Sequence, residues 1–299
     1  MSDSKRLSEA EPNLRRALAL FQKLATDFPT AAVYRSNLAE TQRYLGHLLE
    51  QTQRVPEAET VYRQALGLFE KLAADSPSDR HSRFNLVALH KKLGELWRAA
   101  GQEQQAEQAY RQAMPIQEKL IAEFPDVPEY HTDLAGTLRD LATLAHRRRD
   151  LAAAPQWLRG AIEHQQAALK LRPDNTAFRQ ALCQSWGNLT SILVQLGEHG
   201  AAAEAADEFS RLFPESADNH YVATCFLARC ARLAEQDSQL TPDKRRAAAQ
   251  TYADQAMNQL RKAIQRGFKD AEQLSQNADL DSLRSRADFK RLLAELAIP

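Results

Sequence analysis

Few residues in this sequence are of a type and spacing that could do chemistry. Cys183, Cys225 and Cys230 form no CxxC pair, and the last two are five positions apart, off a common helix face. Such an odd, sparse set predicts small core residues in a reducing compartment. The eight histidines have no HxxxH or HExxH spacing to bring two zinc ligands onto one helix face, so we predict single polar surface residues. They include His47, His81, His90 and His131.

The common catalytic sequence patterns are also missing. No serine sits in a Gly-x-Ser-x-Gly elbow, and there is no Walker-type phosphate loop. The glycine-rich loop, His-Arg-Asp and Asp-Phe-Gly patterns of protein kinases are missing as well. Carboxylates are abundant, so none stands out as an acid–base couple. We therefore expect no catalytic residues, no metal, no cofactor and no enzyme activity from this chain itself.

The sharpest local charge cluster is the run His146-Arg-Arg-Arg149. At the end of a helix, such cations interact favourably with the helix dipole and the free carbonyl groups. The alternative is a clamp for a carboxylate or phosphate group of a partner, which arginine side chains suit. The first explanation is favoured, and the second stays open.

The composition predicts that these residues are carried by helices. Glycine (10 residues) and proline (12) are scarce, whereas Ala, Leu, Gln, Glu and Arg, which lose little entropy in a helix, are plentiful. Thirty-nine basic residues balance thirty-nine acidic ones, and this lack of a net basic field argues against a nucleic-acid partner. No apolar run approaches the roughly 20 residues needed to cross a membrane. The polar start predicts no signal peptide and a cytoplasmic location.

A repeat of 48 residues organises the chain. Columns of identical residues recur at this step, and they are the prolines Pro29, Pro77, Pro125 and Pro173, the leucines Leu45, Leu93, Leu141 and Leu189, and the alanines Ala58, Ala106, Ala154 and Ala202. Apolar residues within one repeat have helical spacing on two faces, separated by a short polar turn. Each repeat therefore predicts a helix A, a turn, a helix B and a proline-marked linker. Pro115 falls inside one helix B and is expected to kink it, for no functional reason that the sequence indicates.

The predicted architecture is all-α, a right-handed α-solenoid of helical hairpins with about five helix pairs, a leading half-unit and a C-terminal capping helix. The fourth helix B is expected to be about two turns shorter, because Pro214 follows Pro173 by only 41 residues. A lone leading helix B indicates a segment of something longer, and an unpaired capping helix is the alternative. The predicted units are 1–30 (leading helix), 31–79, 80–127, 128–175, 176–218 (shortened), 219–269 (a divergent pair) and 270–299 (the capping segment).

These columns resemble the tetratricopeptide repeat (TPR). The Leu-Gly pair of that family is matched by Leu45-Gly46 and Leu93-Gly94, and its aromatic residue in helix B by Tyr62 and Tyr110. The third and fourth units depart from the pattern, with Ala142 and Thr190 in place of glycine. The usual TPR period is 34 residues, so 48 implies longer helices.

A narrower resemblance concerns the repeat region that follows the kinase domain in planctomycete-type serine/threonine kinases. It is carried by Glu118-Lys-Leu120 with Phe124-Pro125, and by the tail motif Asp279-Leu-Asp-Ser-Leu-Arg284. This resemblance implies a role in assembling signalling complexes.

The TPR resemblance also implies a concave binding surface, lined by helix A at positions not used for packing. The matching residues of this chain are Arg43, His47, Lys91, Glu95, Arg98, Arg139, Thr143, His146 and Arg147. Their mild basic excess favours an acidic or C-terminal peptide as the ligand, and solvated charge without a ligand is the competing interpretation. We therefore predict a protein-binding scaffold, with self-association or a spacer role as the alternative. The sequence names neither the partner, nor its form, nor the oligomeric state.

Overall fold

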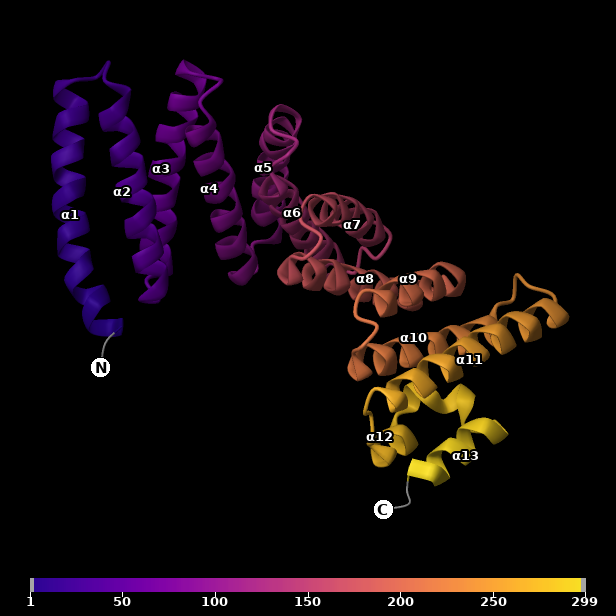
Figure 1. The fold of residues 1–299 in the computed structure, drawn as a ribbon. Coiled ribbons are helices and arrows are strands. Elements are labelled where there is room, and N and C mark those ends of the chain that lie inside the picture. The colour runs from indigo at the N-terminus through magenta and orange to yellow at the C-terminus, as the bar shows by residue number, and fades with distance from the viewer. Residues whose placement is uncertain (1–2, 297–299) are drawn as a thin grey trace. The chain divides into compact units, whose positions relative to one another are not determined.

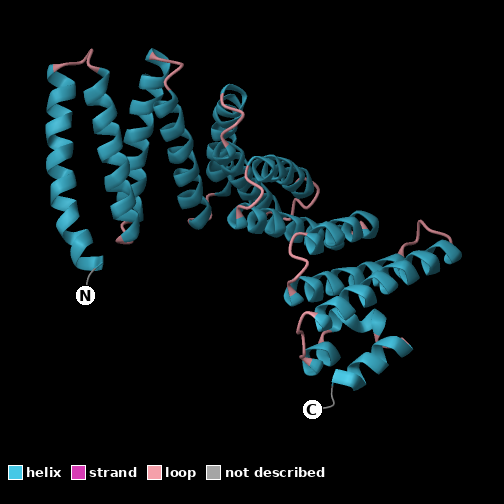
Figure 2. Cartoon of the chain, viewed as in Figure 1, coloured by secondary structure: helices cyan, strands magenta, loops and turns pink. Residues whose placement is uncertain are grey.

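The computed structural model describes the backbone of residues 3–296 and the side chains of residues 10–296, and its described part contains helices and no strand (Figure 2). Fourteen helices follow one another along the described chain. They are α1 (Asp3–Asp27), α2 (Ala32–Gln51), α3 (Val55–Asp75), α4 (Arg80–Ala99), α5 (Glu103–Glu123), α6 (Pro128–Arg147), α7 (Ala154–Leu171), α8 (Thr176–Leu196), α9 (His199–Arg211), α10 (Ala217–Gln236), α11 (Pro242–Gln265), α12 (Ala271–Gln276), the 3₁₀ helix η1 (Ala278–Leu283) and α13 (Ala287–Leu296). The predicted all-α array of consecutive helix pairs is confirmed.

The chain divides into two compact units, Met1–Leu144 and Ala145–Pro299, and each is described by itself. In the first unit, neighbouring helices from α1 to α5 pack side by side and alternate in direction (Figure 1). In the second unit, α7 packs on α8, α8 on α9, α9 on α10, and α10 on α11. No helix in the described part is both long enough and apolar enough to span a lipid bilayer.

A glycine in helix A allows helices A and B to pack closely in each of the first two hairpins. A Cβ atom on Gly46 would lie 2.5 Å from the ring of Tyr62, and one on Gly94 would lie 2.6 Å from the ring of Tyr110. Both tyrosines are almost completely buried. The Leu-Gly motif therefore creates the space that the aromatic ring of helix B fills.

The turns between helices A and B repeat the same backbone conformation. Gln53, Gly101, Arg149 and Gly197, which follow one another at steps of 48 residues, all have φ between 59° and 78°. Glycine adopts this left-handed conformation without steric cost, whereas the other two residues do so at some cost. The repeat is thus visible in the backbone as well as in the sequence.

An ion pair joins the start of helix A to the end of helix B in each of the first two hairpins. Arg35 Nη1 lies 2.7 Å from Asp75 Oδ2 in the first hairpin. In the second, the buried Arg83 donates two hydrogen bonds to Glu123, at 2.8 and 2.6 Å. The hydrogen bond from Arg83 lowers the pKa of Glu123. These equivalent pairs hold the open ends of the hairpins together.

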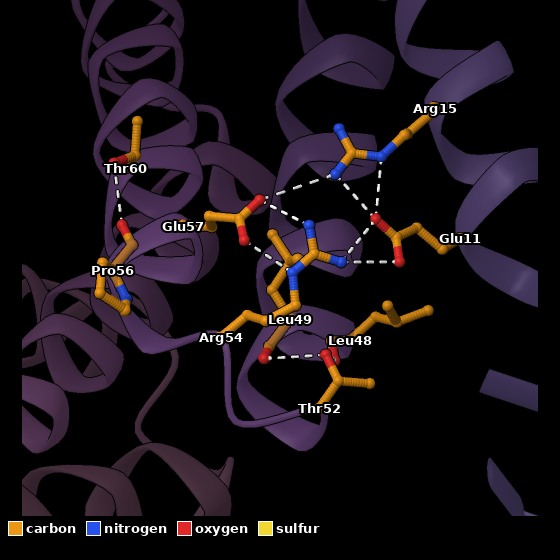
Figure 3. Close-up of polar contacts among 9 residues, drawn as sticks. All are labelled: Glu11, Arg15, Leu48, Leu49, Thr52, Arg54, Pro56, Glu57 and Thr60. Atoms are coloured by element: carbon orange, nitrogen blue, oxygen red, sulfur yellow. Dashed lines mark hydrogen bonds and ion pairs between the residues drawn. The ribbon is translucent and has the colours of Figure 1, made fainter. Parts of the chain in front are cut away.

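The leading helix α1 is tied to the turn between α2 and α3 by four charged residues (Figure 3). The Arg54 guanidinium group donates to Glu11 at 2.8 and 2.9 Å and to Glu57 at 2.6 Å. Arg15 donates to Glu11 at 2.7 Å and lies 3.8 Å from Glu57. Hydrogen bonds from the two arginines lower the pKa of both carboxyl groups. This cluster, which extends from α1 to α3, fixes the first helix on the hairpin that follows it.

In the second unit, the shortened helix B is present as predicted, and α11 begins with an N-cap. Helix α9 has 13 residues, whereas α3 and α5 have 21 each. The Thr241 hydroxyl accepts a hydrogen bond from the Lys244 amide at the start of α11. The C-terminal segment packs on α10 through η1, and it buries Leu274, Leu280 and Phe289.

Three local predictions can be compared with the structure. The prediction of surface histidines is wrong for His90 and His220, which are buried. His220 lies between the Gln259 side chain, 2.7 Å away, and the Pro214 carbonyl oxygen, 2.9 Å away, so packing and hydrogen bonds explain its burial. Helix α5 continues through Pro115. Helix α1, Asp3–Asp27, lies within the segment 1–30 predicted to hold the leading helix.

Candidate functional site

The candidate site lies in the first unit, on the faces of α2, α4 and α6 that do not pack against helix B. Helix α2 contributes Arg43 and His47, helix α4 contributes Phe84, Ala88 and Lys91 among others, and α6 contributes Asp133. Arg43 and Lys91 occupy the same position of the repeat, as do His47 and Glu95, which explains why these four side chains gather on one side of the unit.

A cavity of about 250 Å³ opens among these side chains. Val87, Leu89 and the ring of Tyr62 line this cavity, so much of its lining is apolar. Phe84 stands on the wall with 48% of its surface exposed, an unusual position for a phenylalanine that has no packing role of its own. The small side chain of Ala88 leaves the space open. The cavity therefore offers an apolar recess bordered by charged groups.

Opposite charges alternate along the border of the cavity. Lys92 Nζ lies 2.8 Å from Glu95 Oε2 and 3.6 Å from Glu50 Oε1. Lys91 Nζ is farther from its partner, 3.8 Å from Asp133 Oδ1. Lys92 is thus held by two carboxylates, whereas Lys91 keeps hydrogen-bonding capacity for another anion.

Arg43 is the basic group at the cavity with the least satisfied side chain. Its guanidinium group lies over the ring of Tyr44, 4.5 Å from the ring centre. Its Nε atom is buried and, among the described atoms, has no hydrogen-bond acceptor. Burying a charged N–H group without an acceptor is costly, so a carboxylate that reached this atom would gain a strong hydrogen bond.

Two aspartates on α6 lie in surroundings that disfavour their charge. Burial raises the pKa of Asp133 and of Asp140, although Lys91 acts in the opposite direction on both. Arg98 and Arg139 also act on Asp140, and they stabilise its charged form. The mild basic excess expected around these two arginines is therefore reduced by an aspartate that lies among them.

The structure brings some of the predicted groove residues together. Arg43, His47, Lys91 and Glu95 line one cavity. Three others lie on the same helices outside its lining, namely Arg98 on α4 and Arg139 and Thr143 on α6. His146 and Arg147 lie in the last turn of α6, where they complement the helix dipole. These two residues belong to the second unit and do not contribute to this cavity.

The sequence analysis missed the apolar part of the site. Phe84 was not among the predicted groove residues, and neither were Ala88, Lys92 and Asp133. A signal was nevertheless present, because Phe84 occupies the column of Ser36 and Thr132, and a phenylalanine in an otherwise polar column of helix A indicates an exposed aromatic side chain. Among the described residues, no group of three or more His, Cys, Asp or Glu side chains could hold a metal ion.

Comparisons with known proteins describe the fold. No family model matches the sequence, and no match was found among curated proteins. Among solved structures, the chain is similar to BtubC from P. vanneervenii, with 16% identity, a TM-score of 0.49 and coverage of 88% of this chain and 93% of that one. It is also similar to YrrB, a TPR protein with an unusual peptide-binding site (15% identity, TM-score 0.38, coverage 82% and 96%), and to PilF of Pseudomonas aeruginosa (15%, 0.38, 87% and 90%). At these identities, nothing about function follows from the likeness.

Proposed function

We propose that this chain is a protein-binding scaffold whose first unit holds an extended acidic peptide segment of a partner protein. The segment crosses the faces of α2, α4 and α6, inserts one apolar side chain beside Phe84, and presents a carboxylate to Arg43. The observation that carries the proposal is the apolar cavity with an unsatisfied, buried arginine N–H group at its border.

The energetics of such binding suit a preformed site. Helices that already pack against one another have little ordering to lose when a ligand binds. Burying an apolar side chain of the ligand contributes about 1.5–3 kcal/mol, and a carboxylate on Arg43 adds a charge-assisted hydrogen bond. Lys91 is the second group for an acidic ligand, since its partner Asp133 is 3.8 Å away and has a raised pKa.

The class of partner follows from the sequence resemblance. The motifs shared with the repeat region behind kinase domains suggest a partner in a cytoplasmic signalling complex. Arg98, Arg139 and Thr143 then contribute contacts outside the cavity.

Binding of acidic peptides tests the proposal directly. Fluorescence anisotropy with short peptides rich in Asp and Glu, each carrying one leucine or phenylalanine, measures their affinity for the full chain. The double variant Arg43→Glu with Lys91→Glu is expected to weaken binding by at least about 10-fold, since it removes two cationic contacts. The control Lys71→Glu with Lys23→Glu makes the same charge change at two exposed lysines outside the cavity lining.

A second variant tests the apolar recess. Ala88→Trp places a large ring in the cavity and is expected to block peptides with an apolar anchor, while leaving the charged border in place. Equal affinities for wild type, Ala88→Trp and the double charge variant would refute the proposed site.

A further inference from the structure

A second cavity, of about 480 Å³, lies within the second unit, between α10, α11 and the segment that connects η1 to α13. Helices α10 and α11 pack along each other, and η1 packs on α10 (Figure 1). Three arginines line this cavity, Arg245 and Arg246 near the start of α11 and Arg286 just before α13, and we call it the arginine recess. Its described lining contains one carboxylate, that of Glu235. The recess therefore has an excess of positive charge, which attracts an anion.

Much of the hydrogen-bonding capacity of the two arginines on α11 is unused. Arg245 Nε donates to the Leu240 carbonyl oxygen at 3.2 Å. Arg245 also helps to lower the pKa of Asp237, but the two side chains form no ion pair in the described part of the chain. The side chain of Arg246 has neither an ion pair nor a hydrogen bond with any described residue. Because a guanidinium group carries five N–H donors, most donors of this pair are available to a ligand.

The third arginine of the recess is held in place by two aspartates. Arg286 Nε lies 2.9 Å from Asp288 Oδ1, and Arg286 Nη2 lies 2.7 Å from Asp254 Oδ1. These bonds leave the Nη1 group of Arg286 without an acceptor among the described residues. A guanidinium group that is already fixed loses little conformational entropy when an anion binds to it.

The chemistry of the arginine recess fits a phosphate monoester better than a carboxylate. A phosphate monoester carries nearly two negative charges at neutral pH and has three strong acceptor oxygens, so several guanidinium groups can bind it at once. A carboxylate has one charge and two oxygens. No aromatic residue is part of the described lining, so a nucleobase would find no ring on which to stack. These features favour a phosphorylated group without a base.

Hydrogen-bond acceptors at the same recess favour a peptide as the carrier of the phosphate. Gln250 Nε2 donates to Asp254 Oδ1 at 2.9 Å, and Ser282 Oγ donates to the Ala228 carbonyl oxygen at 2.8 Å. The side-chain oxygens of Gln250 and Ser282 can therefore accept hydrogen bonds from the backbone N–H groups of a bound peptide. The small side chain of Ala249 in the lining leaves room for that backbone.

We propose that the arginine recess binds a phosphorylated serine or threonine side chain of a partner protein. The three arginines hold the phosphate, and Gln250 and Ser282 accept hydrogen bonds from the backbone beside it. The recess lies wholly within the second unit, whereas the cavity on α2, α4 and α6 is lined by residues of the first unit. Binding of a phosphorylated side chain therefore stands or falls independently of the acidic-peptide site.

A blocked phosphoserine, N-acetyl-phosphoserine N-methylamide, tests this proposal on the full chain. Titration followed by phosphorus NMR is expected to give a dissociation constant of about 1 mM or tighter, since several charge-assisted hydrogen bonds form. Arg246→Glu should weaken binding by at least about 10-fold, because it replaces a cation of the recess with an anion. The control Lys244→Glu makes the same charge change two positions earlier on α11, at an exposed side chain outside the lining, and should bind like the wild type. Circular dichroism shows whether either variant loses helix.

Other probes identify the ligand and the site. Blocked glutamate, glucose 6-phosphate and inorganic phosphate should each bind at least about 5-fold more weakly, since the first lacks the second charge and the other two lack the flanking amides. Arg43→Glu with Lys91→Glu should leave the affinity for blocked phosphoserine unchanged, because both residues line the other cavity.

Four results would overturn the proposal. They are no spectral change up to about 10 mM ligand, an equal loss of affinity in Arg246→Glu and Lys244→Glu, an affinity for glucose 6-phosphate equal to that for blocked phosphoserine, and an equal affinity for inorganic phosphate. The third result would indicate a site for a phosphorylated metabolite, and the fourth an adventitious ion only.

Discussion

The buried His90 is expected to make the stability of the first unit depend on pH. Its side chain is on α4 with 6% of its surface exposed, and burial lowers its pKa to about 4. The unfolded chain has an ordinary histidine pKa of about 6.5 and binds a proton more readily than the folded one between these two values. Acidification from pH 7 therefore favours unfolding. The contribution is about 2 kcal/mol at pH 5 and about 3 kcal/mol at pH 4.

The repeat itself supplies the variant that isolates this effect. The column of His90 contains Gln42 in the preceding unit and Leu138 in the following one, so His90→Leu introduces a residue that the fold already accepts at this position. Urea unfolding, followed by circular dichroism at several pH values, gives the free energy of unfolding for both proteins. The difference between them should change by about 3 kcal/mol between pH 7 and pH 4, in favour of the variant at low pH.

A matched control separates the effect of losing a titratable group from the effect of introducing a leucine. Gln42→Leu introduces a leucine at the equivalent position of the preceding unit without removing a titratable group, and its effect on the free energy of unfolding should be constant with pH. Parallel pH profiles for wild type and His90→Leu would refute the argument, because they would mean that folded His90 binds a proton as easily as the unfolded chain does.

Three further outcomes are expected. Gly94→Ala forces a methyl group against a buried tyrosine ring and should destabilise the first unit by about 1–3 kcal/mol, whereas Gly67→Ala, in an open helical position, should stabilise it by about 0.5–1 kcal/mol in the same urea titration. Arg83→Met should lower the thermal midpoint by roughly 2–4 °C, and Arg35→Met, which removes a single exposed ion pair, should lower it less. Asp133→Asn should bind acidic peptides several-fold more tightly than the wild type at pH 7 in anisotropy titrations, since it removes a repulsive charge at the cavity.

The helical hairpins and their turns could be predicted because the repeat encodes them locally. Leu45-Gly46 and Tyr62 are a close-packed pair whose members are both visible in the sequence, and the same pair recurs one repeat later. Position 53 and its equivalents have a positive φ at the turn whether or not the residue is glycine. The place of a residue in the repeat therefore determines this conformation more strongly than its amino-acid type does. Periodicity was therefore a sufficient guide to the fold.

The site could be predicted only in part, since its properties arise between helices. Arg43 and Lys91 were expected there because the TPR resemblance implies a binding surface lined by helix A at positions not used for packing. The burial of His90 and the raised pKa of Asp133 depend on the side chains that neighbouring helices pack around them. The position of a residue in the repeat does not predict these contacts. Phe84 was missed for another reason: it is an exposed aromatic residue at a position of helix A whose equivalents, Ser36 and Thr132, are polar.

Positions at which this chain departs from its own repeat therefore indicate residues that do more than stabilise the fold. Where the first two hairpins agree, as at the close-packed glycines and the ion pairs between helices A and B, the residues explain folding. Phe84 differs from the polar residues of its column, and Arg54 differs from Gln102 at the same position one repeat later. The first difference borders the cavity, and the second fixes α1 on the following hairpin. In a repeated architecture, a residue that stacking does not require is free to serve recognition. The proposed peptide contact at Phe84 rests on such a residue.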